Sequence, residues 1–299
     1  MKQFAVPICR LAVAALGVGA VLTATSAAAE VSLRFQDRDV ARMVSLGGSC
    51  NRCELSGRNL SGATFTGATF ISATLVGANL RGAELTGSNF SSSDFSRADM
   101  RGVEINGANF TGSIFVDVSL IGAESSGAVF SRANLSRANL SSVEMTGVNM
   151  NGAALTDANL TSAELFGATL ANVGARNASF ADAEMNASNL SGGDFSGASF
   201  RNASLDGARL MNGGFARADF AGASLRRTDI RGVDLSHARN LTQDQVGGAC
   251  ADDATRLPHG LRISLCRSRS FVRVAPPAPP RPPAPPVPPR SRNLVLAAD

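Results

Sequence analysis

The sequence predicts an all-β solenoid, in which the chain winds into a stack of four-sided coils. The strongest observation is a column of large apolar residues at every fifth position of residues 55–235. This column holds 17 Leu, 12 Phe, 4 Met and 2 Ile in 37 consecutive repeats, and only Ser125 and Ala175 depart from it. Two positions earlier stand mostly small residues, such as Ala63. A period of five fits neither the 3.6-residue turn of a helix nor the two-residue alternation of a flat strand.

The five-residue period is explained by a chain that turns a corner in every repeat. Each side then points one large and one small side chain inward, and the Gly, Ser and Asn between them suit tight turns. Four sides give a square coil of about 20 residues, stacked about 4.8 Å from the next coil by backbone hydrogen bonds. The repeats therefore predict about nine coils and a rod about 44 Å long. Ser125 and Ala175 leave space in its core, and we expect Leu at either position to stabilise the fold.

The first 29 residues have the pattern of a secretory signal peptide. Lys2 and Arg10 precede an apolar stretch, residues 11–22, and small residues end the segment at Ala27-Ala28-Ala29. The apolar stretch is too short to span a bilayer, although an N-terminal membrane anchor is the alternative interpretation. We expect cleavage after residue 29, a periodic or secreted location of the Gram-negative bacterial type, which means the periplasm or the medium, and no membrane span in the mature chain.

The remaining chain divides by composition into four parts. Residues 30–52 form an expected N-terminal cap with a short helix over Asp37–Leu46, and residues 53–237 form the solenoid. Residues 238–267 form an expected C-terminal cap, in which Thr242 and Gln245 have capping-box spacing at a helix start. A solenoid needs such caps because its core and strand edges are otherwise open at both ends. Residues 268–299 form a proline-rich cationic tail.

Several repeats resemble those of the pentapeptide-repeat family. The resemblance is carried by segments such as Ala78-Asn79-Leu80-Arg81-Gly82 and Ala158-Asn159-Leu160-Thr161-Ser162. It implies a right-handed quadrilateral β-helix, a handedness that the spacing alone does not give. The stretch from Leu241 to Cys266 also resembles the segment that follows the repeats in exported bacterial members, in which a Cys-x-x-Cys pair similarly opens the repeats.

Four cysteines follow the signal peptide, and an even number in an exported chain favours disulfides. The two pairs flank a rod about 44 Å long, whereas a disulfide needs Cα atoms within about 7 Å. Bonds between the two ends of one molecule are therefore excluded, which predicts Cys50–Cys53 and Cys250–Cys266. A redox role for Cys50 and Cys53 is the alternative, but the βαβ setting of Cys-x-x-Cys oxidoreductases is missing.

Charge is unevenly spread along the mature chain. Residues 53–237 hold 13 Arg against 17 acidic residues, while residues 238–299 hold 9 Arg against 4 Asp. Ten prolines stand in residues 275–289, so this segment is expected to adopt extended polyproline II without a packed core. The tail is either a passive spacer or a contact for an anionic envelope polymer or a partner's aromatic groove.

Six glutamates lie 20 residues apart, each just before the large apolar residue of one side; we call them the glutamate ladder: Glu84, Glu104, Glu124, Glu144, Glu164 and Glu184. Neighbours about 4.8 Å apart repel by about 1 kcal/mol even in water. We expect Arg81 and Arg101 to relieve Glu84 and Glu104. The hypothesis is a weak cation or basic-partner edge centred on Glu124, Glu144 and Glu164; the alternative is a solvated acidic edge that aids solubility.

The residue types of common catalytic centres are scarce. His237 and His259 are the two histidines, and neither has Cys, Asp or Glu at metal-ligand spacing. We therefore expect no catalytic residue, no metal, no cofactor and no enzymatic activity. The sequence predicts an exported structural or protein-interaction scaffold of the cell envelope, with an unknown protein or envelope polymer as partner and no nucleic acid. The alternative, implied by the family resemblance, is a DNA mimic that occupies type II topoisomerases, which the signal peptide and weak acidity disfavour.

Overall fold

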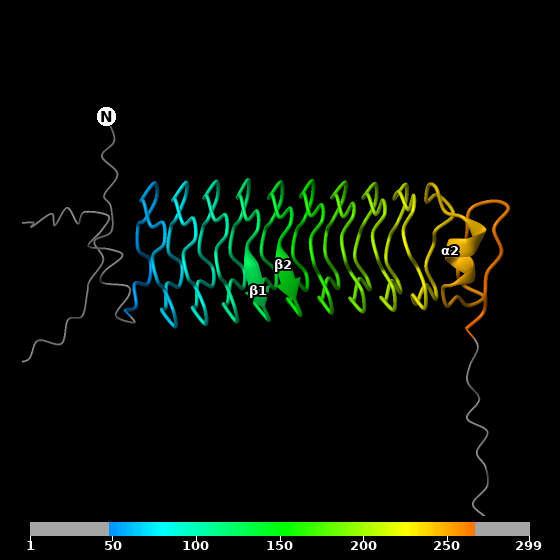
Figure 1. The fold of residues 1–299 in the computed structure, drawn as a ribbon, viewed down its shortest axis with the longest axis horizontal. Coiled ribbons are helices and arrows are strands. Elements are labelled where there is room, and N and C mark those ends of the chain that lie inside the picture. Colours follow the sequence, from blue (N-terminus) through cyan, green and yellow to red (C-terminus); the bar gives the residue numbers. More distant parts are fainter. Residues whose placement is uncertain (1–47, 267–299) are drawn as a thin grey trace, which may run out of the picture. The chain divides into compact units, whose positions relative to one another are not determined.

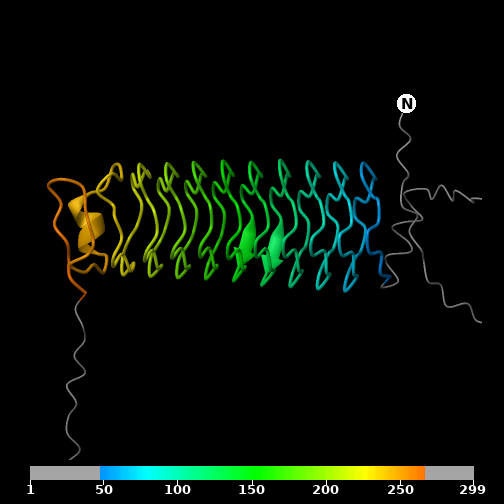
Figure 2. The same cartoon turned by 180° about the vertical axis from the view of Figure 1, so that it is seen from behind.

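The computed structural model describes residues 48–266, which wind into a series of four-sided coils (Figure 1). Seen from behind, the coils follow one another without interruption up to a short helix (Figure 2). The expected signal peptide, the helix over Asp37–Leu46 and the proline-rich tail lie outside the described residues.

Successive coils are joined by parallel pairing between residues 20 positions apart. Asn59 pairs with Asn79, and Asn79 pairs with Asp99 one coil further on. Each side of a coil contributes mostly a single paired residue, so only two strands are long enough to be named, β1 (Glu124–Ser126) and β2 (Glu144–Thr146), which pair in parallel. Backbone hydrogen bonds therefore run along the axis of the stack, as the five-residue period predicts.

The corners between sides have the geometry of type II turns. The amide of Ala63 donates to the carbonyl of Leu60 at 3.1 Å, and Gly62 between them has a φ of 64°. That conformation favours glycine, but the same position in other repeats is filled by Ser, Asn, Asp or Arg, and by Ala187 with a φ of 58°. One left-handed residue in almost every repeat therefore sets the four-sided shape.

The predicted apolar columns form the core. The large residues and most of the small ones two positions earlier are fully or almost fully buried. Serines among the small residues bind the backbone: Ser93 Oγ donates to the carbonyl of Phe70 and Ser113 Oγ to that of Phe90, both at 2.7 Å. These bonds explain why hydroxyls are tolerated in this column, since a buried polar group costs stability only when it lacks a partner.

Phenylalanines stack along the axis in two groups, which confirms the assignment of residues to sides. Centroids of Phe70, Phe90 and Phe110 lie 5.0 and 5.9 Å apart with near-parallel rings. Phe180 and Phe200 stack at 5.2 Å in the second group. Rings on neighbouring sides also meet edge to face across the core, a contact that the column pattern did not predict.

The C-terminal cap begins with the helix α2 (Gln243–Gly247), and the predicted capping box between Thr242 and Gln245 is present. The Gln245 side-chain amide also donates to the carbonyls of Phe220 and Ala223, each at 2.8 Å. These carbonyls belong to the coil that precedes the helix, where no further coil covers them. One side chain thus both caps the helix and binds it to the end of the stack.

Beyond α2 the chain returns to the stack instead of forming a separate cap. Asp229 pairs with Cys250, Asp234 with Arg256 and Ala251 with Leu265. These spacings differ from 20 because the helix and a loop interrupt the repeat. At the other end, parallel pairing already includes Ser49, which pairs with Thr69. Segments that the sequence assigned to caps therefore contribute paired residues at both ends of the described coil.

We predict that Gly193→Ala destabilises the protein whereas Gly174→Ala does not. A Cβ at Gly193 would lie 2.6 Å from Cε2 of Phe195, whose ring is held by stacking on Phe215 at 5.1 Å. A Cβ at Gly174 would meet nothing within 4 Å. Overpacking of this kind costs about 1–3 kcal/mol. Urea unfolding of both variants measures the difference; equal midpoints would contradict the packing described here.

We also predict that Ser125→Ala, and more so Ser125→Leu, stabilises the protein. Ser125 is 5% exposed, and its Oγ has no hydrogen-bond partner among the described residues. Removing a buried unpaired hydroxyl recovers about 1 kcal/mol, and Leu also fills space. Ser93→Ala is the matched control, which should lose stability because Ser93 Oγ donates to Phe70 and accepts from the Ala73 amide. Melting temperatures test both directions, and a lower value for both Ser125 variants would refute the prediction.

Candidate functional site: the glutamate ladder

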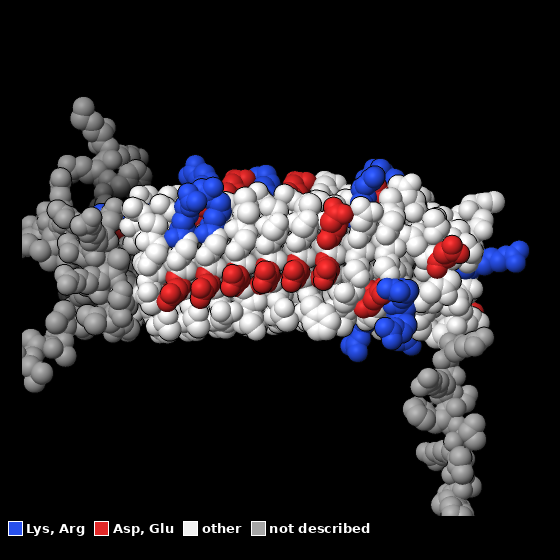
Figure 3. All heavy atoms as spheres, in the orientation of Figure 1, with Lys and Arg blue, Asp and Glu red and all other residues white. Residues whose placement is uncertain are grey.

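The glutamate ladder forms a straight row of carboxylates on one face of the coil, visible as the line of six acidic residues in Figure 3. Neighbouring members are paired residue on residue: Glu84 with Glu104, Glu104 with Glu124, and so on to Glu184. The middle pair, Glu124 and Glu144, begins β1 and β2. The row therefore has the spacing of paired strands, about 4.8 Å per step.

The side chains point outward because each precedes a buried residue by one position. In β1 and β2 the central Ser125 and Met145 are buried while the flanking residues are exposed. The other members of the ladder are exposed in the same way. Alternation of side-chain direction along an extended segment makes this outward placement unavoidable once the apolar column is inside.

Among residues 48–266, none of the six carboxylates forms an ion pair or a side-chain hydrogen bond. The expectation that Arg101 relieves Glu104 is wrong, because its Nε donates to Asp99 Oδ1 at 2.7 Å. Asp99 and Arg101 flank one buried residue on the adjoining side, so they meet without crossing a corner. Arg81 likewise makes no ion pair with Glu84. The repulsion along the ladder is thus not offset by arginines.

Aspartates elsewhere on the surface differ in this respect. Arg137 binds Asp117 with two hydrogen bonds, Nε to Oδ1 at 2.7 Å and Nη2 to Oδ2 at 2.8 Å. These bonds hold the pKa of the Asp117 carboxyl below its usual value. The bond from Arg101 does the same for the pKa of Asp99. The unpaired state of the ladder is therefore a property of that row rather than of the surface as a whole.

A second column of polar residues follows the ladder two positions further along each repeat, and it was missed in the sequence. Its members on the same coils are Thr86, Asn106, Ser126, Thr146, Phe166 and Asn186. Asn106 Oδ1 accepts from the amide of Ser126 at 2.7 Å, so part of this column is tied to the backbone of the next coil. Phe166 is 57% exposed, the largest apolar group beside the carboxylates. The same 20-residue comparison that revealed the ladder would have found this column.

The ladder offers hard oxygen atoms, but one carboxylate per coil. No group of three or more His, Cys, Asp or Glu within the described part of the chain is arranged to hold a metal ion. Discrete coordination by several ligands, as calcium requires, is therefore not built into residues 48–266. A row of single charges is better suited to an extended basic molecule that meets several carboxylates in sequence.

The disulfides form as predicted. Cys50 and Cys53 are bonded with Cα atoms 5.6 Å apart, and Cys250 and Cys266 with Cα atoms 4.6 Å apart. Cys53 occupies the inward small-residue column, and Arg52 beside it has a φ of 59°, so the first bond spans an ordinary corner of the coil. The second bond links the return segment to the coil near its end.

His237 lies beside a serine, but in an arrangement unlike that of a hydrolase. Its Nδ1 is 3.0 Å from Ser236 Oγ, and that hydroxyl donates to Asp234 Oδ1 at 2.6 Å. In a catalytic triad the histidine stands between the serine and the carboxylate and accepts the serine proton. Here the serine stands in the middle and gives its proton to the aspartate. His259 lies in the return segment. Over residues 48–266, no helix is both long and apolar enough to cross a membrane.

A family model for pentapeptide repeats matches residues 49–87, 78–115, 113–152, 133–172, 178–213 and 215–239. The chain belongs to the pentapeptide-repeat family. Its fold is the right-handed quadrilateral β-helix of that family, as the resemblance implied. The matching model describes a repeat and not an enzyme family. No curated protein sequence matches the chain.

Solved structures of other pentapeptide-repeat proteins share this architecture. HetL, a protein involved in heterocyst differentiation regulation in the cyanobacterium Nostoc sp. strain PCC 7120, is 24% identical and superposes with a TM-score of 0.60, covering 77% of this chain and 100% of its own. QnrB1, a plasmid-mediated fluoroquinolone resistance protein, is 22% identical with a TM-score of 0.32, covering 60% of this chain and 93% of its own. At these identities the likeness concerns the fold alone.

We predict that Glu124→Gln stabilises the protein at low ionic strength, and that it does so more than Glu84→Gln. Glu124 has a ladder neighbour on each side, whereas Glu84 pairs with Thr64 on one side and with Glu104 on the other. Salt screens exposed charges, so the gain should shrink in about 1 M NaCl, where the Debye length is about 3 Å. Melting temperatures at two salt concentrations test this; an equal gain for both variants, or one that persists in salt, would count against repulsion along the ladder.

Proposed function

We propose that this protein is an exported, non-catalytic scaffold of the cell envelope that binds a basic partner along the glutamate ladder. The observation that carries the proposal is the row of six exposed carboxylates, held in register by backbone pairing, with no ion pair among the described residues. A rigid row of like charges raises the energy of the free protein slightly, and a cationic ligand removes that cost on binding.

The backbone of the coil makes this face suitable for binding. The carboxylate-bearing residues are placed by hydrogen-bonded pairs, so little backbone entropy is lost when a ligand engages them. Charge complementarity of this kind mainly raises association rates and weakens with salt. The partner that fits is an extended chain with several positive charges, since it can contact successive coils.

Export is supported by the residues that precede and flank the coil. The basic start, short apolar stretch and small residues of positions 1–29 have the composition of a signal peptide. The two disulfides are of the kind that persists in oxidising compartments. An envelope location would place the ladder among polymers and proteins that carry positive charge.

The experiment compares two variants with equal loss of charge. The ladder variant carries Glu124→Gln, Glu144→Gln and Glu164→Gln, and the control carries Glu54→Gln, Asp157→Asn and Asp182→Asn on other columns. The probe is a fluorescent ten-residue oligolysine, titrated with the full mature chain at several salt concentrations. We expect the ladder variant to bind about tenfold more weakly than the control, a loss of about 1.4 kcal/mol. Equal affinities would refute the ladder as the binding face.

Location is tested with the native N-terminus and the complete chain. Fractionation of a Gram-negative host, with mass spectrometry of the mature N-terminus, should find the protein cleaved near residue 29 outside the cytoplasm. An uncleaved cytoplasmic protein that inhibits a purified type II topoisomerase would overturn the proposal and support DNA mimicry. The two outcomes are distinguishable because they differ in both location and target.

A further inference from the structure

Met211 differs from the other described methionines in where its sulfur lies. Met100, Met145, Met150 and Met185 occupy the inward column and are fully buried. Met211 follows the buried Leu210 by one position, so its side chain points outward and is partly exposed. A thioether at the surface is accessible to small oxidants, whereas one inside a close-packed core is shielded.

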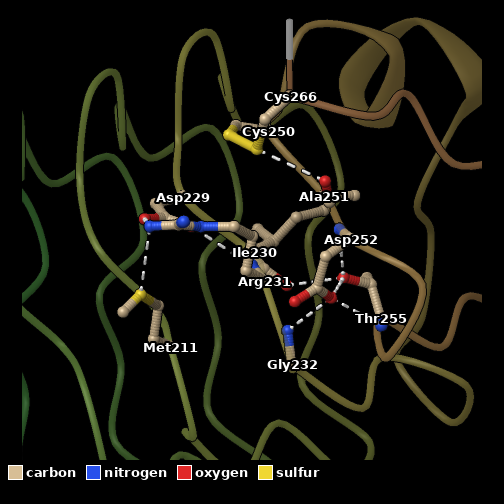
Figure 4. Close-up of polar contacts among 10 residues, drawn as sticks. All are labelled: Met211, Asp229, Ile230, Arg231, Gly232, Cys250, Ala251, Asp252, Thr255 and Cys266. Atoms are coloured by element: carbon tan, nitrogen blue, oxygen red, sulfur yellow. Dashed lines mark hydrogen bonds and ion pairs between the residues drawn. A yellow bond between two sulfur atoms is a disulfide. The ribbon is translucent and has the colours of Figure 1, made fainter. Parts of the chain in front are cut away.

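A fixed hydrogen-bond donor stands beside this sulfur. Nη2 of Arg231, on the next coil, donates to Met211 Sδ at 3.6 Å (Figure 4). The same guanidinium is anchored by Asp229, with Nε to Oδ1 at 2.9 Å and Nη2 to Oδ2 at 2.7 Å. Arg231 is therefore held against the sulfur by a carboxylate that its own side chain keeps charged, because the Arg231 bonds lower the pKa of Asp229.

We propose that Met211 is a reversible oxidation site for peroxides, with Arg231 positioned to bind the sulfoxide. In the reaction a sulfur lone pair attacks one oxygen of hydrogen peroxide and the O–O bond breaks. The second oxygen leaves as water after proton transfer. The sulfur is oxidised by two electrons and the peroxide is reduced, so one peroxide gives one sulfoxide and one water. The sulfoxide is the form that methionine sulfoxide reductases reduce.

Arg231 gives the oxidised side chain a partner that it would otherwise lack. A sulfoxide oxygen is a far better hydrogen-bond acceptor than a thioether sulfur, and the Nη2 group already faces this position. Oxidation of a core methionine would place a polar oxygen among apolar groups and disrupt packing. At Met211 the new oxygen lies outside the core beside a cation, so the coil can carry the modification without unfolding.

The site lies close to the end of the coil. Asp229, which anchors Arg231, pairs with Cys250 of the second disulfide, and Figure 4 shows these residues together. The oxidised sulfur would therefore alter charge and hydrogen bonding near the return segment, and not at the glutamate ladder. The inference is independent of the proposed function.

The test uses the full mature chain with both disulfides intact. Protein is treated with increasing hydrogen peroxide, digested and analysed by peptide mass spectrometry, which resolves each methionine separately. We expect Met211 to be oxidised about tenfold or more faster than Met100, Met145, Met150 and Met185, because burial excludes the oxidant. Treatment with a methionine sulfoxide reductase should reverse the modification. Comparable rates at Met211 and the four buried methionines would overturn the proposal.

The role of Arg231 is tested by two arginine variants. Arg231→Leu removes the donor beside the sulfur, and Arg227→Leu is the control because Arg227 makes no ion pair among the described residues. We expect oxidation to leave the melting temperature of the wild type and Arg227→Leu unchanged or raised, and to lower that of Arg231→Leu. The same shift in all three proteins would refute capture of the sulfoxide. Met211→Leu should abolish the shift in every background.

Discussion

The fold depends on one constraint: each coil must hydrogen-bond to the next in parallel, with residues 20 positions apart opposite one another. The amide and carbonyl groups of an extended chain are costly to leave unpaired away from water. Here they are satisfied by neighbouring coils, for example by the bond from Leu60 N to the Asn79 carbonyl at 2.7 Å. Core packing, corner geometry and the order of surface residues all follow from this register, because a side chain can change neither its coil nor its direction while pairing is kept.

Surface charge is therefore arranged by the backbone before side chains find partners. The glutamate ladder is a consequence, since its members are opposite one another whether or not the charges repel. Aspartates on other columns meet arginines, either across two coils, as Asp117 and Arg137 do, or within one side, as Asp99 and Arg101 do. The ladder lacks such partners among the described residues, which makes it the part of the surface on which a cationic ligand would gain most.

The regular part of the molecule could be predicted from the sequence because every repeat carries the same information. Large residues such as Phe70 and Phe90 fall inside together, and the stacking of their rings was foreseeable from a 20-residue comparison. The ends could not be predicted in the same way. The pairing of Cys250 with Asp229 depends on how many residues α2 removes from the repeat, and no period shows that. The partner of Arg101 was also missed, because two nearby carboxylates compete for a flexible side chain and the sequence does not rank them. Met211 could have been singled out, since it is a methionine outside the five-residue column.

The corners have a consequence for how such a surface can change over generations. Adding five residues to the middle of the coil would keep every core position filled, yet it would rotate all later side chains to the neighbouring side. The row of carboxylates would then be cut into two rows on adjacent faces. Adding 20 residues would leave the row straight, with one more coil between its halves or one more carboxylate within it. Length can thus be gained in whole coils without losing a face, whereas a single repeat redistributes every surface beyond it.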